Sequence, residues 1–76
     1  MIPQQLNGYR VLIATSTPKA PATRAGYVVL VDREKPPCRF VTAWTGVGDK
    51  DWGNGHYFES FSEASKDFER RSNRGY

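Results

Sequence analysis

Residues 39–74 read RFVTAWTGVGDKDWGNGHYFESFSEASKDFERRSNR and contain the two clearest structural signals in the chain. The first signal is residues 39–45, which are rich in β-branched and aromatic side chains and are followed by a glycine. This composition is typical of a pleated, half-buried strand. The second signal is the start of a helix near Ser60, and the fold depends on how that helix meets the strands.

The helix start at Ser60 fits a capping box. In this motif the Ser60 hydroxyl accepts a hydrogen bond from the backbone N–H of Glu63, and the Glu63 carboxylate accepts one from the backbone N–H of Ser60. Helical spacing then places four residues on one face, namely Phe61, Ala64, Ser65 and Phe68. The opposite face carries Glu63, Lys66, Asp67 and Arg70. The pattern predicts one amphipathic helix over residues 61–73, which must dock on the strands because so short a helix is marginal alone in water.

Upstream of this stretch, residues 9–15 and 27–32 predict two further strands, YRVLIAT and YVVLVD. The second is an uninterrupted apolar run, which indicates burial on both faces and a central position. Residues 56–58 predict a short strand that leads into the helix. Because consecutive strands usually lie next to each other, we expect an α+β fold, a four-stranded antiparallel meander followed by one C-terminal helix packed on one sheet face.

Two long loops separate the strands. Residues 16–26 contain two prolines and several small polar residues, which cannot sustain a ladder of hydrogen bonds. Residues 46–55 contain four glycines and carry Trp52 in the middle. Trp52 is either an anchor folded back onto the domain or an exposed contact residue, and the large apolar area of its side chain favours the anchor.

The length of 76 residues indicates one small domain over residues 1–76, with a small core and modest stability. The one cysteine, Cys38, cannot form an internal disulfide, and with the one histidine, His56, it cannot complete a zinc site of four N or S ligands. No charged-then-apolar leader and no apolar run of membrane-spanning length is present, so we expect a cytoplasmic protein. The net charge of +3 permits contact with nucleic acid or an acidic partner without requiring either.

Strand alternation divides the sheet residues into two faces. One face is aromatic and carries Tyr9, Val11, Ile13, Tyr27, Val29, Val31, Phe40, Thr42 and Trp44. The other carries Arg10, Leu12, Ala14, Val28, Leu30, Arg39, Val41, Ala43 and Thr45. The single helix can cover one face, and we expect it to cover the aromatic one. The other face would then expose a contiguous apolar patch, which usually marks an interface with a partner protein or a second copy of the chain. In the alternative interpretation, the two long loops fold over that face.

These patterns predict a small non-enzymatic module that binds protein through the uncovered sheet face or through the basic end of the helix. The predicted partner-binding residues are Arg10, Leu12, Val28, Leu30, Arg39, Val41, Trp52, Arg70, Arg71 and Arg74. The alternative is a nucleic-acid-binding module that stacks bases on sheet aromatics and contacts phosphates through arginines. The residues for that alternative are Tyr9, Tyr27, Phe40 and Trp44, with Arg10, Arg24, Arg39 and the C-terminal arginines.

Candidate catalytic and metal-ligating residues are few. Nothing in the sequence places Cys38 within reach of His56, as a cysteine hydrolase requires. Residues 49–51, Asp-Lys-Asp, are similar to the start of a calcium loop, but Gly53 occupies the third ligand position and no glutamate follows at the required distance. We therefore expect no catalytic, cofactor-binding or metal site.

Several segments of the C-terminal half carry a resemblance to a group of known proteins. They are FVTAW, the loop around Trp52, GHYF, and the later Ala64, Asp67, Phe68 and Arg71. At these positions the sequence resembles small uncharacterised proteins carried on bacterial plasmids, prophages and integrative elements. The resemblance implies no catalytic residues, and it implies roles such as binding a host or phage protein, including inhibition of a defence complex.

Overall fold

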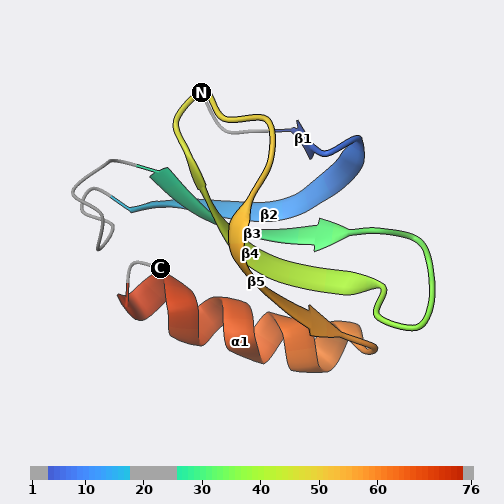
Figure 1. Ribbon diagram of the computed structural model, residues 1–76. Helices are drawn as coiled ribbons and strands as arrows, with labels where there is room; N and C mark the ends of the chain where they lie inside the picture. Colours follow the sequence, from blue (N-terminus) through green and yellow to red (C-terminus); the bar gives the residue numbers. More distant parts are fainter. Residues whose placement is uncertain (1–3, 18–25, 75–76) are drawn as a thin grey trace.

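The computed structural model describes residues 4–17 and 26–74, and within them an antiparallel sheet is followed by one helix (Figure 1). The elements are β1 (Gln5–Leu6), β2 (Tyr9–Thr17), β3 (Gly26–Asp32), β4 (Phe40–Gly46), β5 (Gly53–Phe58) and α1 (Phe61–Arg74). The five strands lie in the order β1-β2-β3-β4-β5. The predicted α+β meander with a C-terminal helix is therefore confirmed, with one additional strand.

The additional strand is β1, which pairs with the start of β2 through Leu6 and Tyr9. Asn7 and Gly8 form the turn between them, and both have positive φ angles, of 53° and 80°. This is the backbone that a two-residue hairpin turn requires, and Asn-Gly is the favoured sequence for it. An Asn-Gly pair is a turn signal in the sequence itself, whereas a strand of two residues is too short to show alternation.

Helix α1 begins with the predicted cap in a modified form. The backbone N–H of Glu63 donates to the Ser60 hydroxyl oxygen at 3.1 Å, as expected. The Glu63 carboxylate accepts from the Ser60 hydroxyl at 3.3 Å, whereas we expected it to accept from the Ser60 backbone N–H. The Phe61 ring then meets the Phe40 ring edge-on, with centroids 5.6 Å apart, and this contact ties the first turn of α1 to the start of β4.

Helix α1 covers the sheet face that carries Leu30 and Thr42, which are cross-strand partners on β3 and β4 (Figure 1). The residues that α1 buries are Ala64, Asp67 and Arg71. We expected Asp67 on the outer face and Phe61 in the core, but Asp67 is 8% exposed and Phe61 is 46% exposed. The helix is rotated about its axis relative to the prediction because the sheet beneath it presents a polar group, Thr42.

The opposite sheet face is covered by the chain itself. Its buried cluster comprises Leu6, Tyr27, Val29, Val31, Val41 and Ala43, with Tyr9, Val11, Ala14 and Trp52 packed against it. The sheet curls so that the β1–β2 turn meets the loop before β5, where the backbone N–H of Asn7 donates to the carbonyl of Lys50 at 2.9 Å. Trp52 is half-buried on this core, as the anchor interpretation expects.

The expectation of an uncovered apolar face is therefore wrong. Three of its predicted contact residues, Val28, Leu30 and Val41, are each 0% exposed. The face assignment was also wrong: Val28 and Leu30 pair with Trp44 and Thr42, not with the Val41 side of β4. All seven residues of β3 are buried, in agreement with its uninterrupted apolar run.

Two further expectations can be compared with the structure only in part. Most of the predicted loop over residues 16–26, with Arg24, lies outside the described residues, so its part in covering the sheet is not described. Within residues 4–17 and 26–74, no helix is long and apolar enough to cross a membrane.

Candidate functional site

The ten predicted partner-binding residues fall into three groups. Four are buried, namely Val28, Leu30, Val41 and Arg71. Trp52 is half-buried, and the exposed remainder are Arg10, Leu12, Arg39, Arg70 and Arg74. The exposed residues come from β2, from the residue before β4 and from the last two turns of α1, so the predicted sheet-face surface is not formed.

Arg39 is held in a structural ion pair. Its Nε and Nη2 donate to the two carboxylate oxygens of Asp32 at 2.7 and 2.8 Å, across the ends of β3 and β4. The guanidinium also lies 5.2 Å from the centroid of the Phe40 ring. The hydrogen bond from Arg39 holds the pKa of the Asp32 carboxyl below its usual range, against the opposing effect of burial. Arg39 therefore holds the end of β3 and the start of β4 together.

A buried polar network lies between the sheet and α1, and sequence reasoning missed it. The Thr42 hydroxyl donates to the Asp67 carboxylate. His56 Nδ1 lies 3.0 Å from the same carboxylate oxygen. Arg71 Nη1 donates to the Thr42 carbonyl at 2.9 Å. The only sequence signal for this network is the i, i+4 spacing of Asp67 and Arg71 on the face that also carries Ala64.

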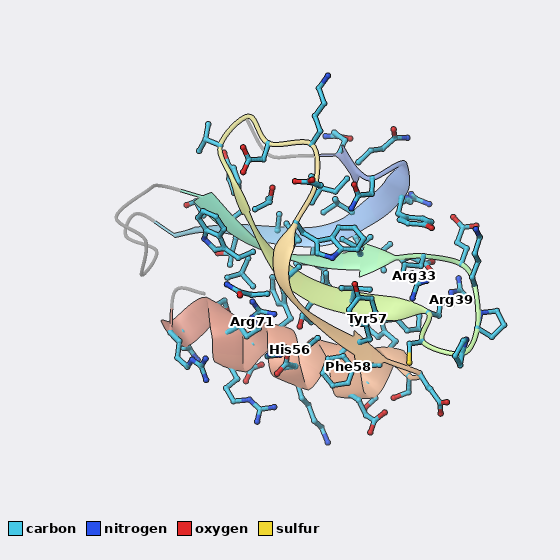
Figure 2. The ribbon with its side chains drawn as sticks, viewed as in Figure 1. Arg33, Arg39, His56, Tyr57, Phe58 and Arg71 are labelled. Carbon is cyan, nitrogen blue, oxygen red and sulfur yellow. The ribbon has the colours of Figure 1, made fainter. Side chains whose placement is uncertain are left out.

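A pocket opens beside this network, between β5 and the C-terminal half of α1. It has a volume of about 260 Å³ and is lined by Asn54, Gly55, His56, Arg71 and Arg74. Figure 2 shows His56 on β5 and Arg71 on α1 next to each other at this position. Two arginines and a histidine thus surround one concave site, which we call the basic pocket.

A row of aromatic side chains lies on the opposite side of β5. The rings of Tyr9 and Trp52 are 6.2 Å apart between centroids. Gly55 lies between the side chains of Trp52 and Tyr57. A Cβ placed at Gly55 would lie 3.1 Å from Tyr57 Cε1 and 3.2 Å from Trp52 Nε1, so both rings contact this position. We call Tyr9, Trp52 and Tyr57 the aromatic strip.

A cation lies over each end of the aromatic strip. The Arg33 guanidinium is 5.4 Å from the Tyr57 ring centroid, and the Lys35 ammonium is 5.9 Å from the Tyr9 ring centroid. Arg33 is also fixed by a hydrogen bond from its Nη1 to the carbonyl of Cys38 at 3.0 Å. Tyr57 is 49% exposed, so the strip reaches the surface. The sequence analysis named Trp52 as a partner-binding residue and Tyr9 for the nucleic-acid-binding alternative, but it did not name Tyr57, Arg33 or Lys35.

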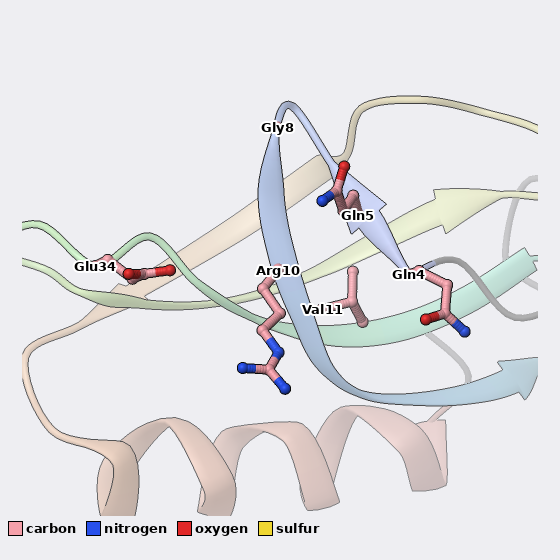
Figure 3. Close-up of a pocket in the computed structure, with 6 residues that line it drawn as sticks. All are labelled: Gln4, Gln5, Gly8, Arg10, Val11 and Glu34. Carbon is pink, nitrogen blue, oxygen red and sulfur yellow. The ribbon is translucent and has the colours of Figure 1, made fainter.

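A second depression, of about 480 Å³, is lined by Gln4, Gln5, Gly8, Arg10, Val11 and Glu34 (Figure 3). Its polar side chains do not converge on one point, because the guanidinium of Arg10 and the amide of Gln5 point in opposite directions in Figure 3. This depression is therefore the weaker candidate for a ligand site.

Among residues 4–17 and 26–74, no group of three or more His, Cys, Asp or Glu side chains is placed to hold a metal ion. No family model matches the chain, and comparisons with curated proteins and with solved structures found no relative. The basic pocket and the aromatic strip are therefore the two surface features that bear on function.

Proposed function

We propose that this chain is a small non-enzymatic protein-interaction module that binds its partner through the aromatic strip. The observation that carries the proposal is the row formed by Tyr9, Trp52 and Tyr57, with a cation over each end. The energy of protein interfaces is concentrated in a few Tyr, Trp and Arg residues, and this strip has that composition.

The strip is suited to binding because two of its members, Tyr9 and Trp52, and the flanking Arg33 are already fixed. Trp52 packs on the core, and Arg33 is hydrogen-bonded to the Cys38 carbonyl. Side chains that are ordered before binding lose little conformational entropy on association, which favours affinity. The flanking Arg33 and Lys35 favour a partner segment that combines an apolar anchor with acidic groups. The resemblance to small proteins of bacterial mobile elements suggests a host or phage protein as that partner.

The test is a comparison of two truncations on the same module. Tyr57→Ala removes a half-exposed ring from the strip, whereas Val47→Ala shortens a side chain that is 59% exposed and outside the strip. We expect affinity capture from a bacterial lysate to recover a protein with the wild-type chain and with Val47→Ala, and to lose it with Tyr57→Ala. Equal recovery by both folded variants would refute the strip as the binding surface.

Nucleic-acid binding is the second candidate, because exposed aromatic rings flanked by cations are also the elements of a single-stranded nucleic-acid site. The rings for this role are those of the strip, since Tyr27 is buried at 8% exposure. Fluorescence anisotropy with a labelled oligonucleotide at several salt concentrations separates the two functions. Affinity that falls steeply with salt and is lost in Tyr57→Ala would favour nucleic acid over protein.

A further inference from the structure

We propose that the segment bound by the aromatic strip is an extended peptide, which pairs with the outer edge of β5 as a further strand of the sheet. The inference rests on the proposed function, because the strip lies beside this edge, and it names the class of partner segment. Strand addition of this kind derives affinity from main-chain hydrogen bonds and specificity from alternate side chains.

The outer edge of β5 is open among the described residues. β5 is the last strand of the sheet, and within residues 4–17 and 26–74 it pairs with β4 alone (Figure 1). None of its six residues is buried, whereas all seven residues of β3 are. The polar contact of His56 with Asp67 joins β5 to α1 through side chains and uses no backbone group of the edge.

The register of the sheet shows which backbone groups face this edge. The N–H of Arg33 donates to the carbonyl of Arg39 at 2.7 Å, so the backbone groups of odd-numbered residues on β3 and β4 face each other. Val41 belongs to this set, and its partner on β5 is Tyr57, so the N–H and C=O of Tyr57 turn away from β4. Gly55 has the same orientation, because its Cβ position lies on the side of the Tyr57 ring.

β5 lacks the features that usually protect a sheet edge. Natural edge strands carry prolines, charged side chains or bulges that prevent further pairing. Residues 53–58, GNGHYF, contain no proline, lysine, arginine, aspartate or glutamate. The register shift between β4 and β5 lies before His56, so residues 56–58 pair regularly. At the other end of the sheet, β1 already pairs with the start of β2, where the N–H of Val11 donates to the carbonyl of Gln4 at 3.0 Å.

The side chains of an added strand would meet different surfaces on the two sides of β5, because they alternate. On one side lies Tyr57, which is 49% exposed, with the rest of the aromatic strip. On the other side lie His56, whose side chain is 51% exposed, and the basic pocket. The segment that fits has apolar residues at alternate positions facing the strip and polar residues between them. An acidic residue on the strip side would lie near Arg33, whose guanidinium is 5.4 Å from the Tyr57 ring centroid.

The probe is a library of short peptides in which apolar residues alternate with threonine and glutamate, and the control library has the same residues in helical spacing. We expect the alternating library alone to yield peptides that bind the wild-type chain saturably. With the tightest binder, deuterium exchange of the Tyr57 and Gly55 amides, followed by NMR, should slow at least about tenfold on saturation. The amides of His56 and Phe58 face β4 and should exchange slowly with or without the peptide.

Backbone methylation of the same peptide separates strand addition from binding by side chains alone. Methyl groups on every second peptide nitrogen remove the N–H donors along one edge of the peptide and keep every side chain. Of the two peptides methylated on alternate sets of nitrogens, one should bind at least about tenfold more weakly, because it loses hydrogen bonds to β5, and the other should bind as the parent does. Both measurements use the wild-type chain, so they do not depend on the folding of a variant.

Two variants distinguish failure of this inference from failure of the proposed function. If the peptide is lost with Tyr57→Ala, is kept by Val47→Ala and binds equally in its two methylated forms, the strip is a binding site but strand addition is refuted. If Tyr57→Ala binds the peptide as the wild-type chain does, both proposals fail. Protection that appears at Ala14 on β2 instead of at Tyr57 would overturn the inference, as would an alternating library without a binder.

Discussion

Arg71 illustrates how one residue can be misassigned by charge alone. It was predicted to contact a partner, but it is 2% exposed and hydrogen-bonded to Thr42 on the neighbouring sheet. Removing a buried cation leaves its partners uncompensated and typically costs about 3–5 kcal/mol of folding free energy. We therefore expect Arg71→Met to destabilise the chain by about this amount, measured by urea unfolding followed by circular dichroism.

The neighbouring Arg70 provides the control for Arg71. Its side chain is 65% exposed and lies 3.6 Å from Asp67, and exposed ion pairs contribute about 0–1 kcal/mol. Arg70→Met should therefore change the unfolding midpoint little. If the two methionine variants lose similar stability, the buried network does not hold α1 on the sheet.

Asp67 makes the free energy of unfolding depend on pH in the acid range. Burial opposes ionisation of its carboxyl, but the hydrogen bonds from Thr42 and His56, with the charges of His56 and Arg71, outweigh burial and place the pKa below the ordinary value of 3.8. Because its pKa is lower in the folded state, the ionised Asp67 carboxylate stabilises the fold above a pH of about 4. This stabilisation is lost as the pH falls through the lowered pKa. The unfolding free energy should therefore decline on acidification, as measured by urea titrations at a series of pH values.

Asp67→Asn should flatten part of that decline, because the amide does not titrate. A residual slope should remain, since the pKa of Asp32 is also lowered by its hydrogen bond with Arg39. Glu69→Gln, at an exposed position on α1, should keep the wild-type slope. An Asp67→Asn variant with an unchanged pH slope would contradict the account of Asp67.

At the scale of elements, local patterns predicted each element except β1, but not how the elements face one another. The cap at Ser60 predicted the start of α1 because the capping interaction is local in sequence. The rotation of α1 was not predictable, since it depends on Thr42 and His56, which lie 25 and 11 residues from Asp67 in the chain and on two different strands. The predicted strand faces were wrong for two reasons. The β3–β4 register places Thr42 and Trp44 opposite Leu30 and Val28, and a register shift between Val11 and Ile13 changes which side chains of β2 share a face.

The start of β3 depends on a glycine for close packing. A Cβ at Gly26 would lie 2.4 Å from the Thr45 carbonyl oxygen and 2.5 Å from Trp44 Cζ2. Overpacking of this kind costs about 1–3 kcal/mol, so Gly26→Ala should lower the unfolding free energy by that order. Gly53→Ala at the start of β5 meets nothing within 4 Å and should be neutral or slightly stabilising in the same urea assay. Equal stability of the two variants would show that the β3–β4 pair relaxes around the added methyl group.

At the scale of the whole molecule, the candidate sites could be predicted less well than the fold. We expected one covering element for two apolar faces, with cover by the two long loops as the alternative. The curl of the sheet supplies the second cover through Leu6, Tyr9 and Trp52, and Trp52 comes from one of those two loops. Curling of a sheet depends on long-range contacts, such as the hydrogen bond from Asn7 to Lys50. The aromatic strip and the basic pocket are products of the same curl and docking, so neither has a contiguous sequence signature.

The covered faces change the expected oligomeric state. The central strand β3 is buried on both sides, and the large apolar side chains that β2 leaves exposed are Leu12 and Ile13, each 38% exposed, which is a small area for self-association among the described residues. Sedimentation velocity should therefore give a single species of 8.6 kDa over about a hundredfold range of concentration. A dimer that persists on dilution would mean that another surface, of which the aromatic strip is the first candidate, pairs two copies of the chain.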